Sequence, residues 1–66
     1  MRLRINGEDK EVAEGTTVAD VVASLGLAGR RVAVERNREV IPASGWNAQP
    51  LAEDDVLEIV HFVGGG

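Results

Sequence analysis

The chain has 66 residues, 44% of them hydrophobic and 27% charged, and a formal net charge of −4. This length corresponds to one small domain, and the balance of hydrophobic and charged residues argues against an intrinsically disordered chain. The acidic balance argues against a nucleic-acid partner, and the absence of cysteine excludes disulfides, cysteine zinc ligands and a cysteine nucleophile.

An amino-terminal β-hairpin is the first predicted element. Leu3 and Ile5 alternate with polar residues, as in a strand that is buried on one face. Asn6 and Gly7 follow, and both tolerate the positive φ that a tight hairpin turn requires. The returning strand is expected over residues 10–13.

A helix is predicted next, beginning at Thr16 or Thr17, because either hydroxyl can cap the free amides of a first turn. It is expected to end at Gly26, since glycine readily adopts the left-handed conformation found after helices. Valine is a weak helix former, so packing on a core must stabilise this helix. The residues spaced for one apolar helical face are Val18, Val21, Val22 and Leu25.

The second half of the chain predicts three further strands. Val32 and Val34 mark the first of them, and a turn at Asn37-Arg38 leads into a short strand over residues 39–41. The third is expected over residues 56–63.

Between these strands, residues 43–51 are predicted to be irregular or a single helical turn, with Trp46 covering one end of the core. The acidic run 53–55 lacks the spacing of a calcium loop. It is therefore interpreted as a solvated turn before the last strand, and no metal site is predicted.

One helix among these strands predicts an α+β domain. The economical packing lays the helix across one face of a mixed four- to five-stranded sheet. A first and last strand paired in parallel at the centre would make this the β-grasp arrangement. The domain is expected over residues 1–63, followed by a flexible glycine tail over residues 64–66.

No apolar run approaches the roughly 20 residues needed to span a bilayer. No membrane partner is therefore expected, and the cytoplasm is the default location. Catalytic groups are also few: His61 is the single histidine, and neither Ser24 nor Ser44 has a base in a recognisable motif. The sequence therefore predicts a protein substrate or carrier with no catalytic site of its own, and not an enzyme.

The glycines Gly64, Gly65 and Gly66 carry the functional hypothesis. Ordering glycine residues costs much backbone conformational entropy, so one interpretation is a frayed tail. The other is that a backbone without Cβ atoms enters a slot too narrow for other residues and delivers the α-carboxylate of Gly66. That carboxylate is an adequate nucleophile toward the α-phosphate of ATP, and the resulting acyl-adenylate accepts a sulfur or nitrogen nucleophile.

The last predicted strand supports the second interpretation. Glu58 marks one of its faces as solvent-exposed, and Val60 and Phe62 share that face. Exposed apolar side chains often mark partner surfaces. We expect Glu58, Val60 and Phe62 to form a docking surface, unless the loop around Trp46 covers Val60 or Phe62.

The element order, the segments 34–37 (VERN) and 39–42 (EVIP), and the ending 60–66 (VHFVGGG) resemble the ThiS family of ubiquitin-like sulfur carriers over essentially the whole chain. The resemblance implies a β-grasp fold with no bound cofactor. It also implies that a ThiF-like adenylating enzyme uses ATP to activate Gly66 and that a persulfide donor converts it to a thiocarboxylate. The thiazole synthase ThiG then takes the sulfur for the thiazole ring of thiamine. Gly65 and Gly66 match the family's functional pair, and Gly64 lengthens the thin segment.

Other functions stay open at this point. A MoaD-like carrier for molybdopterin synthesis shares the fold and the Gly-Gly ending, although it is typically longer. A ubiquitin-like modifier would join the same activated Gly66 to target lysines, but Lys10 is the only lysine available here for building chains. A plain binding module with a frayed tail is the remaining alternative.

Overall fold

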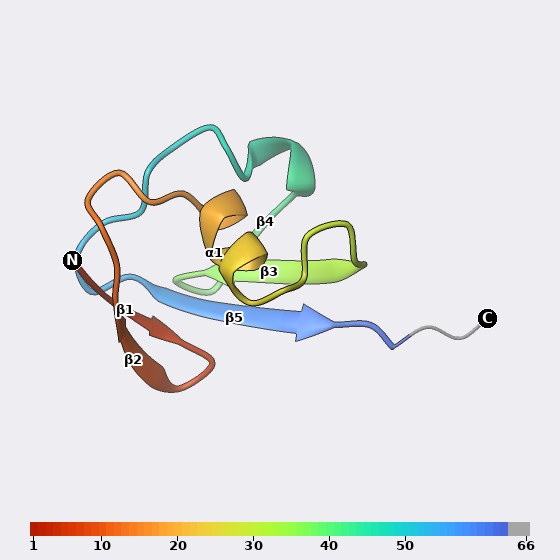
Figure 1. Ribbon diagram of the computed structural model, residues 1–66, viewed down its shortest axis with the longest axis horizontal. Coiled ribbons are helices and arrows are strands. Elements are labelled where there is room, and N and C mark those ends of the chain that lie inside the picture. Colours follow the sequence, from red (N-terminus) through yellow and green to blue (C-terminus); the bar gives the residue numbers. More distant parts are fainter. Residues whose placement is uncertain (64–66) are drawn as a thin grey trace.

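The computed structural model describes residues 1–63, which form one five-stranded sheet with a helix packed across it (Figure 1). Residues 64–66, where the sequence places the glycine tail, lie outside the described part of the chain. Within residues 1–63, no helix is long and apolar enough to cross a membrane. The elements are β1 (Arg2–Ile5), β2 (Glu8–Glu11), α1 (Val18–Ser24), β3 (Val32–Arg36), β4 (Glu39–Ile41), the 3₁₀ helix η1 (Ala43–Gly45) and β5 (Val56–His61).

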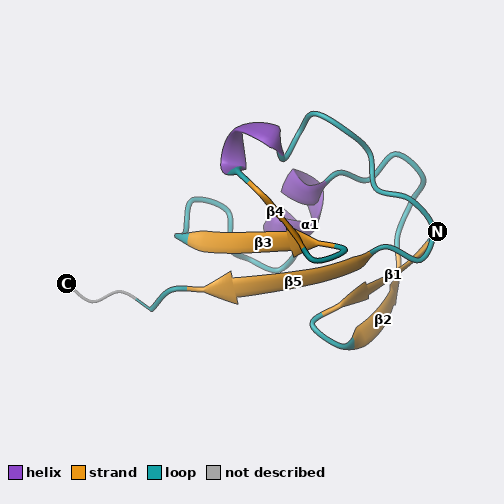
Figure 2. Cartoon of the chain, turned by 180° about the vertical axis from the view of Figure 1, so that it is seen from behind, coloured by secondary structure: helices purple, strands orange, loops and turns teal. Residues whose placement is uncertain are grey.

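The strand order is β2-β1-β5-β3-β4, so the first and last strands of the chain lie side by side at the centre of the sheet. β1 and β5 are parallel, with Arg4 opposite Val56 and Ile5 opposite Leu57, and the remaining pairs are antiparallel. Both helical segments lie on the same side of the sheet (Figure 2). The predicted β-grasp arrangement is confirmed, and its sheet has five strands.

The core lies between α1 and one face of the sheet. Alternation along β1, β3 and β5 sends every second side chain to that face. The helix contributes three of its four predicted apolar residues. The buried hydrophobic residues are Leu3, Ile5, Val18, Val21, Val22, Val34, Leu51, Leu57 and Ile59.

The amino-terminal hairpin turns at Asn6 and Gly7, whose φ angles of 51° and 82° confirm the predicted turn. The returning strand, however, is β2 (Glu8–Glu11) and not residues 10–13. Every residue of β2 is charged and exposed, so no apolar alternation marks it. Its position follows from the two-residue turn, which pairs Glu8 directly with Ile5.

The helix begins as predicted, with Thr17 as its N-cap. The backbone N–H of Asp20 donates to Thr17 Oγ1 at 3.2 Å, and the backbone N–H of Thr17 donates to Asp20 Oδ2 at 3.0 Å. This reciprocal capping box satisfies two amides of the first turn. Gly26, at φ 76°, follows the helix as expected. Leu25 is wrongly predicted as a core residue: it is the C-cap and remains 40% exposed.

The β3–β4 hairpin matches the prediction closely. Asn37 and Arg38 have φ angles of 51° and 71°, and β4 has the expected bounds. Beyond β4, η1 supplies the expected single helical turn. The Trp46 indole packs against the core, and its Nε1 donates to the carbonyl oxygen of Ile41 at 2.9 Å. Trp46 therefore covers the core as predicted and also joins this loop to the edge of the sheet.

Candidate functional site

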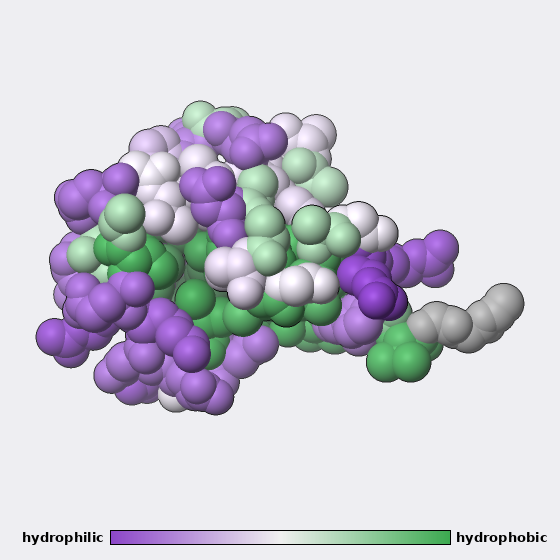
Figure 3. All heavy atoms as spheres, viewed as in Figure 1, coloured by the Kyte–Doolittle hydropathy of each residue, from purple (hydrophilic) through white to green (hydrophobic). Residues whose placement is uncertain are grey.

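The predicted docking residues lie on the sheet face away from α1, called here the open face. Glu58, Val60 and Phe62 are all exposed, with 55% of Val60 and 50% of Phe62 accessible to solvent. The alternative that the loop around Trp46 covers either apolar residue is therefore wrong. Figure 3 shows the opposite side of the molecule, the α1 side, where hydrophilic residues cover the β1–β2 hairpin.

The last strand is shorter than the predicted range 56–63, because β5 ends at His61. His61 is paired with Val32, the first residue of β3, so the neighbouring strand ends the ladder there. One further contact follows, in which the Phe62 N–H donates to the Arg31 carbonyl oxygen at 3.0 Å. The contact fixes the backbone of Phe62 next to the sheet, one residue before the highly exposed Val63.

The strand register places further residues on the open face, among them a glutamate of β3 and a valine of β4. Glu35 of β3 lies directly opposite Glu58, and Val40 of β4 lies directly opposite Glu35. Directly paired residues project from the same face of a sheet. Val40 is 65% exposed and extends the apolar surface beyond β5. Both residues belong to segments that carry the family resemblance, but only the register shows that they share a face with Glu58.

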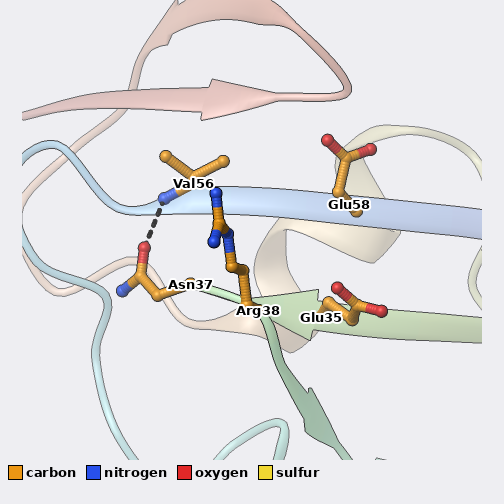
Figure 4. Close-up of a pocket in the computed structure, with 5 residues that line it drawn as sticks. All are labelled: Glu35, Asn37, Arg38, Val56 and Glu58. Atoms are coloured by element: carbon orange, nitrogen blue, oxygen red, sulfur yellow. Dashed lines mark hydrogen bonds between the residues drawn. The ribbon is translucent and has the colours of Figure 1, made fainter.

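A shallow hollow of about 510 Å³ lies on the open face where the β3–β4 turn meets β5. The Arg38 side chain extends across to Val56, and Glu35 and Glu58 lie on neighbouring strands, with the Glu58 carboxylate directed away from β3 (Figure 4). Asn37 Oδ1 accepts a hydrogen bond of 3.0 Å from the Val56 N–H and so joins the turn to the beginning of β5. The hollow therefore has a fixed backbone and charged side chains around it.

The interpretation of residues 53–55 as a solvated turn is wrong for Asp55, which is only 6% exposed. Its Oδ2 accepts hydrogen bonds of 2.8 Å from Arg36 Nε and from the Ala52 N–H, and its Oδ1 accepts one of 2.9 Å from Asn37 Nδ2. Arg36 Nη2 also lies 2.8 Å from Oδ2. The carboxylate thus connects the β3–β4 turn to the segment before β5, and each of its oxygens accepts at least one hydrogen bond from the chain itself.

These contacts determine the pKa of Asp55. Burial alone would raise the pKa of its carboxyl, but the hydrogen bonds from Ala52 and Asn37 and the positive charge of Arg36 together lower it below the ordinary value of 3.8. The folded protein therefore holds the ionised form more strongly than the unfolded chain does.

Stability should consequently depend on pH at the acid end of the range. The contribution of Asp55 is fully present above pH 3.8 and is lost as the pH falls through the lower pKa of the folded state. Urea unfolding at a series of pH values should show a steeper acid loss for the wild-type chain than for the Asp55→Asn variant, whose side chain does not titrate. Equal slopes for the two proteins would contradict this explanation.

Among the other residues considered for catalysis or metal binding are His61 and the acidic side chains. His61 is exposed on β5. Across residues 1–63, no group of three or more histidine, cysteine, aspartate or glutamate side chains is arranged to hold a metal ion. Gly64, Gly65 and Gly66 lie outside the described residues, so their predicted entry into a partner's active site stays a prediction.

Comparison with known proteins identifies the family. The model of the ThiS family matches residues 3–66. The sulfur carrier protein ThiS of Bacillus subtilis is 45% identical over 65 residues, which cover 97% of this chain and 98% of the relative. A thiazole synthase of Magnetococcus marinus is 44% identical over the whole chain, which spans only 20% of that protein.

The solved structures agree with the sequence comparison. The crystal structure of the thiamine biosynthesis protein ThiS from Geobacter metallireducens superposes with a TM-score of 0.81 at 33% identity, and the match covers all of both chains. The family match, the full-length relative and this structure all confirm the resemblance drawn from the sequence. The chain therefore belongs to the ThiS family.

Proposed function

We propose that this chain is a sulfur carrier of thiamine biosynthesis and acts as a protein substrate, with Gly66 as its reacting residue. The observation that supports this best is the position of β5 in the chain. The strand carries exposed Val60 on the open face and ends at His61, and the exposed residues Phe62 and Val63 follow it before the glycines in the sequence. A partner that binds the open face is thereby placed beside the segment that it must modify.

The proposed chemistry takes place on the α-carboxylate of Gly66. One of its oxygens attacks the α-phosphorus of ATP, and pyrophosphate leaves. The terminal sulfur of a persulfide then attacks the acyl carbon and displaces AMP. A thiol cleaves the resulting acyl disulfide at its S–S bond, which leaves a thiocarboxylate on Gly66 and a disulfide on the donor side. The chain binds no cofactor in this scheme, since the adenylating partner consumes the ATP.

Two protein partners follow from this proposal. The first is a ThiF-like adenylating enzyme, which binds the open face and receives the glycines Gly64, Gly65 and Gly66. The second is a ThiG-like thiazole synthase, which accepts the sulfur. The match to part of a Magnetococcus marinus thiazole synthase supports this second partner, because a domain similar to this chain is part of that protein.

Intact-mass spectrometry tests the proposed function. The purified chain is incubated with the cognate ThiF-like enzyme, ATP and a persulfide sulfur source. A mass increase equal to the exchange of one oxygen for sulfur is expected. A conjugate on a lysine side chain would instead indicate a protein modifier, and an unchanged mass with an active adenylating enzyme would leave only a binding module.

Phe62→Asp tests the docking surface separately from the chemistry. If the half-exposed ring anchors the partner, the charged variant should bind the adenylating enzyme more weakly by about 1–3 kcal/mol. Its melting temperature should hardly change, because the ring lies outside the core. Leu25→Asp is the matched control, since Leu25 is also an exposed apolar residue but belongs to the helix side. Equal weakening by both variants, or a loss of stability alone, would refute the docking assignment.

A further inference from the structure

The open face contains an unfavourable pair of charges. Glu35 and Glu58 are directly opposed in the antiparallel ladder between β3 and β5, and both side chains are exposed. Like charges that face each other across two strands destabilise a sheet. Repulsion between the two carboxylates therefore lowers the stability of the sheet, and a positive charge close to both of them would remove this effect.

The described residues do not supply that cation. Within residues 1–63, the side-chain ion pairs are Arg4–Asp9, Lys10–Glu8 and Arg36–Asp55, and none involves Glu35 or Glu58. Arg38 lines the same hollow, but its guanidinium extends to Val56 at the other end (Figure 4). Neither carboxylate therefore forms an ion pair with a residue of the described range 1–63.

Three valines adjoin this pair on the open face, and one of them, Val56, also lies next to Arg4 and Arg38. Val56 and Val60 are the neighbours of Glu58 on the same face of β5, and Val40 lies directly opposite Glu35. All three valines are exposed. A complementary partner surface must therefore present apolar groups to these valines and a positive charge to the carboxylate pair.

We propose that Glu35 and Glu58 together bind one basic side chain of the adenylating enzyme, an arginine or lysine presented from an apolar surface. This inference rests on the proposed function, which supplies the partner. A guanidinium suits the position best, because its several N–H donors can serve two carboxylates at once. A second copy of this chain suits it poorly, since its own open face carries the same carboxylate pair and its net charge is also −4.

The proposal predicts effects of opposite sign on stability and on binding. Neutralising the pair in Glu35→Gln/Glu58→Gln removes a repulsion from the free chain, so its melting temperature should rise. The same change removes the ligands of the partner's cation. Its dissociation constant for the ThiF-like enzyme should therefore increase roughly 10-fold or more at low salt.

The experiment compares this double variant with Glu8→Gln/Glu39→Gln, which changes the net charge equally. Glu8 and Glu39 are exposed on the two edge strands and are paired with Ile5 and Arg36, which places them outside the open face. Titration calorimetry with the full chain and the ThiF-like enzyme, at low and high salt, gives the dissociation constants. Pyrophosphate exchange at saturating carrier gives kcat separately from KM.

For Glu35→Gln/Glu58→Gln we expect a raised dissociation constant and a raised KM, with kcat retained. Its binding should also depend less on salt than that of the wild-type chain. The control variant should bind with nearly unchanged affinity. Equal weakening by both double variants, or wild-type affinity of the first, would overturn the proposal. Wild-type binding without adenylation would refute the proposed function alone, because the dissociation constants would still decide whether the carboxylate pair binds a cation. Failure of the wild-type chain to bind would overturn both.

Discussion

Replacing Asp55 with alanine is expected to lower the free energy of unfolding by about 3–5 kcal/mol, because it breaks a buried ion pair from one side. The change would leave the mostly buried Arg36 guanidinium without its carboxylate. The Ala52 N–H and the Asn37 amide would also lose their acceptor. Such a loss is a large fraction of the total stability of a small domain, which is typically about 5–15 kcal/mol. Urea unfolding followed by circular dichroism measures it.

Asp9→Ala is the matched control for this prediction. Asp9 also pairs with an arginine, since Arg4 Nε lies 3.3 Å from its Oδ1, but both side chains are more than half exposed. Exposed ion pairs typically contribute at most about 1 kcal/mol. Comparable losses for the two variants would show that the Asp55 network does not stabilise the fold in the way described.

The second large effect is expected from Gly65→Val, which should reduce adenylation about 100-fold or more. In the proposed function the backbone at Gly65 passes through a narrow slot, and a branched side chain there would displace the reacting carboxylate. Folding should be unaffected, since the buried hydrophobic core comprises residues from Leu3 to Ile59. The measurement is ATP–pyrophosphate exchange with the ThiF-like enzyme, together with a melting curve.

Val63→Ala is the control for that variant, because it changes side-chain volume at the highly exposed residue before the glycines. It should be adenylated at nearly the wild-type rate. Normal adenylation of Gly65→Val would refute the narrow-slot argument and leave the function of Gly66 to be judged on other grounds.

Local sequence signals predicted most of the fold. Alternation at Leu3 and Ile5, the threonine that caps α1 and the turn at Asn37-Arg38 each act over a few residues, so their signals can be read without knowing the tertiary structure. β2 was placed wrongly because its strand depends on pairing with β1 and not on its own side chains.

Where the candidate site was misjudged, the cause is dependence on residues that are distant in the sequence. Asp55 looks like one of three solvated acidic residues until Arg36, 19 positions earlier, is placed beside it. Glu35 likewise gains importance only from its register with Glu58. The exposure of Val60 and Phe62, in contrast, could be predicted, because Glu58 on the same face indicated contact with water.

Tandem mass spectrometry of the chain purified from its native host is the most direct test of whether Gly66 carries the sulfur. Cleavage after Glu58 releases a peptide that begins at Ile59 and contains the final glycines. We expect this peptide to end at Gly66 and a fraction of it to carry the oxygen-for-sulfur exchange on that residue. A peptide that continues past Gly66, or sulfur located at any other position, would contradict a carrier that works through the Gly66 carboxylate.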